Sequence, residues 1–109
     1  MVLDILGCHW AFKIGHLDRG NVSQMHFGFM DAPNQQLTIN RDVDATWRPY
    51  LAIHEILHAL SFMGHLQFLR LEGQLVDDEA KVDAMASLLA EVLVRNGLFN
   101  DEKLLDDRR

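Results

Sequence analysis

Residues 54 to 58, His-Glu-Ile-Leu-His, combine two metal-binding side chains and a carboxylate in the pattern H-E-x-x-H. On a helix, side chains four positions apart share a face, so His54 and His58 can direct imidazole nitrogens at one point. Neutral imidazole binds Zn²⁺ well. Glu55 is angled away from that point, yet it can reach a water at the metal and accept its proton as a general base. The spacing predicts a zinc site with a catalytic glutamate.

An ordinary amphipathic helix is the alternative reading of the same five residues, because His and Glu are common on helix surfaces. Their setting favours the metal. The surrounding residues are apolar, namely Ile53, Ile56, Leu57 and Leu60. Unpaired polar groups in such a setting are costly, and coordination of a metal would offset that cost.

A third protein ligand is needed, and His65 is the nearest histidine in the chain. In one large class of zinc proteases the pattern continues as H-E-x-x-H-x-x-G-x-x-H. Here Ser61 stands in the place of that glycine and Gly64 in the place of that histidine, so His65 comes one residue late. His65 is therefore the weaker candidate, and a surface or substrate-side position is the alternative for it.

Residues 79 to 83, Glu-Ala-Lys-Val-Asp, supply the stronger candidate. Glu79 and Asp83 are four apart and share a helical face, so Glu79 can give the metal an oxygen ligand. Asp83 can accept the other ring N–H of His54 or His58 and fix its tautomer. The alternative is that this acidic segment is a solvated helix start that favours the helix dipole. We expect Asp77 and its neighbour Asp78 to be solvated residues of that kind.

The first forty residues show the alternation of apolar and polar side chains that is typical of strands. It occurs in residues 8–14, again at residues 25, 27 and 29, and a third time at Leu37 and Ile39. Residues 15–23 have the composition of a turn, and so do residues 31–35, which contain Pro33 and Asn34. The pattern predicts a three-stranded, mostly antiparallel sheet. We expect the strand at residues 36–40 to lie at the edge of the cleft beside the motif helix.

The motif helix is expected to be capped by Asp44 or Thr46, with Pro49 in its first turn, where proline is tolerated. Gly64 is its expected stop. A second helix is expected from about residue 78 to 96.

Asp77 or Asp78 is the expected cap of that second helix, and Gly97 follows its end. A short third helix is expected within residues 100–107. A sheet followed by helices predicts one α+β domain over residues 1–109.

The bulk composition limits the partners. The chain has 109 residues and a net charge of −6, which argues against a general affinity for nucleic acid or anionic membranes. It contains no apolar run as long as the roughly 18 residues of a membrane span. Cys8 is the only cysteine, so neither an intramolecular disulfide nor a four-cysteine zinc module can form. Without a signal-peptide pattern, a cytoplasmic location is expected.

The H-E-x-x-H motif followed by E-x-x-x-D on the next helix resembles the gluzincin signature. The order of elements and residues 82–99 look like minimal gluzincins of viral, prophage and archaeal origin, relatives of the ImmA/IrrE-type metallopeptidases. The resemblance covers the chain from about residue 28 onward, although Leu57 replaces a glycine of the ImmA/IrrE pattern. It implies a small zincin-like fold in which His54, His58 and Glu79 bind zinc and Glu55 is catalytic.

A zinc-dependent endopeptidase acting on protein or peptide substrates is the function that this resemblance implies. A zinc-stabilised binding or structural module without catalysis is the alternative. Glu55 separates the two, because a structural zinc has no use for a base and favours a closed shell of four protein ligands. Tyr50, His65 and Arg70 are the candidates for stabilising the oxyanion or contacting the substrate.

Overall fold

The computed structural model describes residues 2–15, 28–72, 74 and 76–100. These residues form an α+β structure with a four-stranded mixed sheet and two helices. The strands are β1 (Val2–Ile5), β2 (Cys8–Gly15), β3 (Gly28–Asp31) and β4 (Gln36–Asn40). They are followed by α1 (Arg48–Phe62), a short 3₁₀ turn η1 (Gln67–Leu69) and α2 (Glu79–Arg95).

The sheet has the order β1-β2-β4-β3 and is built from two antiparallel hairpins joined side by side. β1 pairs with β2, β3 pairs with β4, and the central pairing of β2 with β4 is parallel. The prediction of three strands was wrong, because a fourth strand, β1, precedes the first alternating segment. A two-residue turn at Leu6 and Gly7, both with positive φ, closes the first hairpin, and such turns match the twist of paired strands.

The prediction that the strand at residues 36–40 lies at an edge is also wrong. β4 lies between β2 and β3, so its backbone is paired on both sides. Its buried residues Leu37 and Ile39 are completely shielded from solvent, as expected for a central strand. β3 is the edge strand on this side of the sheet, and it packs against α1.

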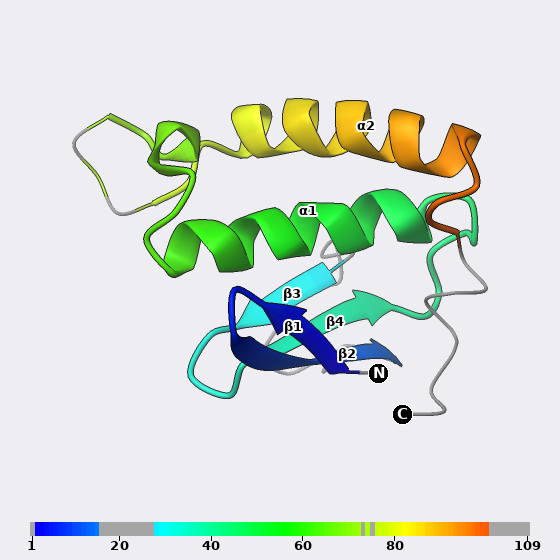
Figure 1. Ribbon diagram of the computed structural model, residues 1–109, viewed down its shortest axis with the longest axis horizontal. Coiled ribbons are helices and arrows are strands. Elements are labelled where there is room, and N and C mark those ends of the chain that lie inside the picture. Colours follow the sequence, from blue (N-terminus) through cyan, green and yellow to red (C-terminus); the bar gives the residue numbers. More distant parts are fainter. Residues whose placement is uncertain (1, 16–27, 73, 75, 101–109) are drawn as a thin grey trace.

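The elements stack in three layers, with α1 between the sheet and α2 (Figure 1). This position explains why α1 is buried on more than one side: its buried residues are Pro49, Leu51, Ala52, Ile53, Glu55, Leu57, Ala59 and Ser61. Among the described residues, α2 buries Val82, Ala86 and Ala90, which are four positions apart and share one side of the helix. The motif helix is therefore the central element of the structure.

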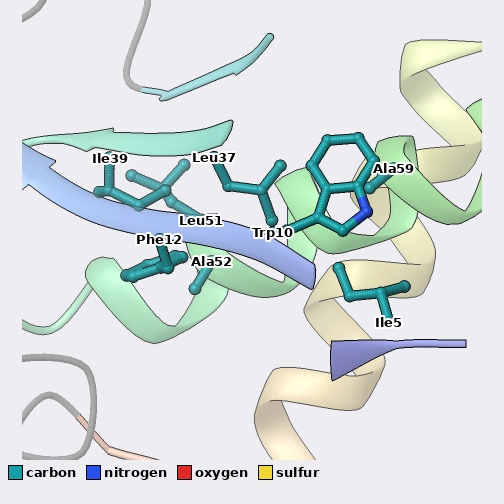
Figure 2. Close-up of a cluster of buried hydrophobic side chains, with 8 residues drawn as sticks. All are labelled: Ile5, Trp10, Phe12, Leu37, Ile39, Leu51, Ala52 and Ala59. Carbon is teal, nitrogen blue, oxygen red and sulfur yellow. The ribbon is translucent and has the colours of Figure 1, made fainter. Parts of the chain in front are cut away.

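The core between the sheet and α1 is a continuous apolar cluster (Figure 2). The strands contribute Ile5, Trp10, Phe12, Leu37 and Ile39, and the helix contributes Leu51, Ala52 and Ala59. Burying a large apolar side chain stabilises the fold by about 1.5–3 kcal/mol relative to leaving it exposed. Packing against this cluster holds the motif helix at a fixed height above the sheet.

The start of α1 differs from the prediction. Trp47 is its N-cap and makes no side-chain capping bond. Asp44 instead accepts hydrogen bonds from the backbone N–H and the hydroxyl of Thr46, which shapes the turn before the helix. Pro49 lies in the first turn, as predicted.

Both helices end at the predicted glycines. Gly64 and Gly97 have φ values of 90° and 68°, a conformation that glycine adopts without steric cost. After α1, the N–H of His65 bonds the carbonyl of Leu60, and the equivalent bond after α2 joins Leu98 to Leu93. These are Schellman motifs, which satisfy the last carbonyl groups of a helix.

The predicted N-cap of α2 is confirmed for Asp78, whose side chain accepts a hydrogen bond from Ala80 N. The turn predicted at residues 31–35 is present between β3 and β4. The predicted third helix and the turn-like residues 16–23 lie outside the described residues, as do residues 25 and 27 of the second predicted strand. Within the described part of the chain, no helix is both long and apolar enough to cross a membrane.

Candidate metal centre

α1 and α2 run antiparallel and bring three of the predicted ligands together (Figure 1). His54 Nε2 lies 3.2 Å from one carboxylate oxygen of Glu79, and His58 Nε2 lies 3.0 Å from the other. The two Nε2 atoms are 3.2 Å apart. Two imidazoles from one helix and a carboxylate from the next therefore converge on one point.

The donor atoms fit a zinc ion in both spacing and chemistry. Ligand atoms about 2.0–2.1 Å from a tetrahedral zinc are separated by about 3.3 Å, close to the distances between these three groups. Burial, followed by the charge of His58, lowers the pKa of His54. The lowered pKa favours neutral His54, and with the ring proton on Nδ1, beside Asp83, the lone pair of Nε2 faces the carboxylate of Glu79. A cation between these donors would remove their mutual repulsion.

Asp83 and Tyr50 lie beside His54, on the side away from Glu79. Asp83 Oδ1 is 2.9 Å from His54 Nδ1, although the approach does not give that buried nitrogen a well-aligned hydrogen bond. The hydroxyl of Tyr50 donates to the same oxygen at 3.1 Å, and its ring is tilted against the imidazole of His54. Burial and the bond to Asp83 raise the pKa of Tyr50, so the phenol keeps its proton.

Asp77 occupies the corresponding place beside His58. Its Oδ2 lies 2.6 Å from His58 Nδ1, and its Oδ1 accepts a hydrogen bond from the hydroxyl of Ser61. Only 13% of the Asp77 side chain is exposed. The prediction that Asp77 is a solvated residue at the helix start was therefore wrong. Asp77 directly precedes the Asp78 cap, and no pattern in the sequence indicates that it contacts His58.

Glu55 lies in the layer between α1 and the sheet. It is 6% exposed, and burial raises its pKa to about 7, against a smaller opposing effect of His58. Gly28 of β3 passes directly over the carboxylate: a Cβ atom at position 28 would lie 3.0 Å from Glu55 Oε2. The edge strand can approach Glu55 this closely only because residue 28 has no side chain.

Two of the other candidates from the sequence, His65 and Arg70, are not members of the three-residue group found among the described residues. His65 is exposed after the end of α1. Arg70 donates a hydrogen bond of 2.6 Å to the carbonyl of Ser61, near the C-terminal end of α1. Of the three suggested oxyanion or substrate residues, Tyr50 is the one in contact with a predicted ligand.

No match to this chain was found in a scan against protein-family models or in searches of curated proteins and of solved structures. The function is therefore inferred from the residues of the site.

Proposed function

We propose that this protein is a small zinc-dependent endopeptidase of the gluzincin type, with a zincin-like fold. The observation that carries the proposal is the convergence of His54, His58 and Glu79, together with the buried carboxyl of Glu55, whose pKa responds to the charges of both His58 and Glu79. In this proposal the first three residues hold the zinc and Glu55 is the general base. Two histidines and one glutamate are a ligand set that catalytic zinc sites use.

A zinc ion held there would supply a Lewis acid that polarises a peptide carbonyl and makes an adjacent water more acidic. Glu55 accepts the proton of that water and delivers it to the leaving amine. A base works best when its pKa lies near the working pH. Burial raises the pKa of Glu55 to about 7 in the metal-free site, and a zinc ion nearby would favour the ionised carboxylate that accepts the proton. Asp83 and Asp77 orient the two imidazoles, and Tyr50 donates a proton to the substrate after its hydroxyl turns from Asp83.

The substrate in this proposal is an extended peptide that pairs with β3. Among the described residues, β3 is hydrogen-bonded to β4 on one side only and forms an edge of the sheet. An exposed strand edge can bind a peptide through main-chain hydrogen bonds. Because Gly28 of β3 lies against Glu55, a peptide bound along this edge would pass close to the base.

A zinc-stabilised binding module is the second candidate, since zinc held between α1 and α2 would also stabilise the fold. Two observations favour catalysis. The group among the described residues offers three ligands, and 65% of the Glu79 side chain is exposed, so the site is accessible from that side. A buried carboxyl at position 55 costs stability when it ionises and has no use in a structural site.

Replacing the base tests the proposal. Glu55→Gln should keep the fold and the zinc, because the amide has the same shape and Glu55 is not a ligand. Peptide hydrolysis should fall by about 100-fold or more, since the amide cannot accept the proton. Wild type and variant are incubated in parallel with proteome-derived peptides, and new termini are identified by mass spectrometry.

Zinc content of both proteins is measured in the same preparations. Cleavage that persists unchanged in the Glu55→Gln protein would refute the role of Glu55. Zinc binding without cleavage in the wild type would favour the binding module.

A further inference from the structure

Backbone hydrogen bonds on both sides of Asp77 hold this residue in place independently of its side chain. Residues 70 and 77 form an isolated antiparallel bridge, and the N–H of Leu71 bonds the carbonyl of Val76 at 2.8 Å. On the other side of the bridge, the N–H of Asp78 bonds the carbonyl of Leu69 at 2.6 Å. Leu69 is 1% exposed and packs in the cluster between the helices. The segment that leads into α2 is thus anchored to the core.

The carboxylate of Asp77 links this segment to α1 at two points one turn apart. One oxygen meets His58 Nδ1 and the other accepts from Ser61, whose side chain is itself buried. Arg70 bonds the carbonyl of Ser61 and so ties the same segment to the end of α1. With both oxygens engaged, the Asp77 side chain has little freedom to turn away from His58.

The carboxylate beside His54 is held less firmly than the one beside His58. The Asp83 side chain is 53% exposed, against 13% for Asp77, and it is shared with Tyr50. A charge-assisted hydrogen bond is stronger where solvent is excluded. The two imidazoles therefore differ in how firmly they are held.

We propose that Asp77 is the positioning residue that sets the metal affinity of His58. Asp77 accepts the Nδ1–H of His58, which leaves the lone pair on Nε2 pointing at His54 and Glu79, and its charge makes that nitrogen a stronger donor. Ser61 holds Asp77 in this orientation. The inference rests on the metal site of the proposed function but does not depend on peptide hydrolysis.

The test compares Asp77→Asn with Asp78→Asn. Both substitutions remove one negative charge from adjacent positions, and asparagine caps a helix as well as aspartate does, so Asp78→Asn is a matched control. Zinc affinity is measured by competition with a chromophoric chelator. Asp77→Asn should bind zinc about 10–100-fold more weakly, as expected on losing a partner of a ligating histidine. Asp78→Asn should stay close to wild type.

A second measurement needs no metal. The ¹⁵N shifts of His58 in the zinc-free wild type, recorded at alkaline pH, should show the proton on Nδ1. In Asp77→Ala the proton should move toward Nε2. The proposal is overturned if the wild-type proton is on Nε2, or if Asp77→Asn binds zinc as tightly as Asp78→Asn. Failure of the wild type to bind zinc would refute the metal centre itself, and the ¹⁵N shifts would still decide the role of Asp77.

Discussion

The carboxyl group of Glu55 loses most of its hydration between α1 and β3, and its pKa rises to about 7. In the unfolded chain the same group ionises near its ordinary value of 4.5. The native state therefore holds this proton more tightly than the unfolded state does. Its contribution to stability is complete below pH 4.5 and is lost as the pH rises to about 7.

Glu55→Gln should therefore stabilise the zinc-free protein at alkaline pH. A difference of about 2.5 pKa units corresponds to roughly 3 kcal/mol, so the variant should exceed the wild type by about this amount at pH 8. Below pH 4.5 the two proteins should be equally stable, because both side chains are then neutral. Urea unfolding in the presence of a chelator, repeated across this pH range, measures the difference. A difference that does not change with pH would contradict the assignment.

At the scale of elements, the contact of β3 with α1 depends on Gly28. A Cβ atom there would lie 3.0–3.2 Å from three atoms of the Glu55 side chain, which is tighter than ordinary van der Waals contact. Either the edge strand or the Glu55 side chain would have to move.

Gly28→Ala should therefore destabilise the protein by about 1–3 kcal/mol, the usual cost of overpacking. Gly15→Ala is the matched control, because a Cβ atom at that strand glycine meets nothing within 4 Å. Urea unfolding of both variants gives the comparison. In a Glu55→Ala background the cost at position 28 should disappear, since the crowding atoms are gone. A cost that is unchanged in that background would show that the strain does not arise from Glu55.

At the scale of the whole molecule, a metal between α1 and α2 would join the outer layer to the central one. A ligand at 100 times its dissociation constant stabilises the native state by about 2.7 kcal/mol. For a chain of this size, zinc should raise the Tm by roughly 10 °C or more. Glu79→Ala should abolish the shift and His65→Ala should retain it, as measured by differential scanning calorimetry. The opposite result would make His65 the third ligand.

The features that the sequence determined by itself depend on residues close together in the chain. Helical spacing puts His54 with His58, and Glu79 with Asp83, on one face, whatever the rest of the fold does. The glycines after both helices and the turn at residues 31–35 are also local signals, and the structure has them where they were predicted. The expected order of a sheet followed by two helices holds for the same reason.

Contacts between distant residues were decided only by the tertiary structure. The parallel pairing of β2 with β4, the closeness of Gly28 to Glu55 and the contact of Asp77 with His58 join segments far apart in sequence. Such pairings depend on how the layers stack, and no periodicity within one segment encodes them. The possible metal ligands can therefore be recognised from local sequence, whereas the packing of α1 between two layers decides what buries Glu55 and which carboxylate lies beside each histidine.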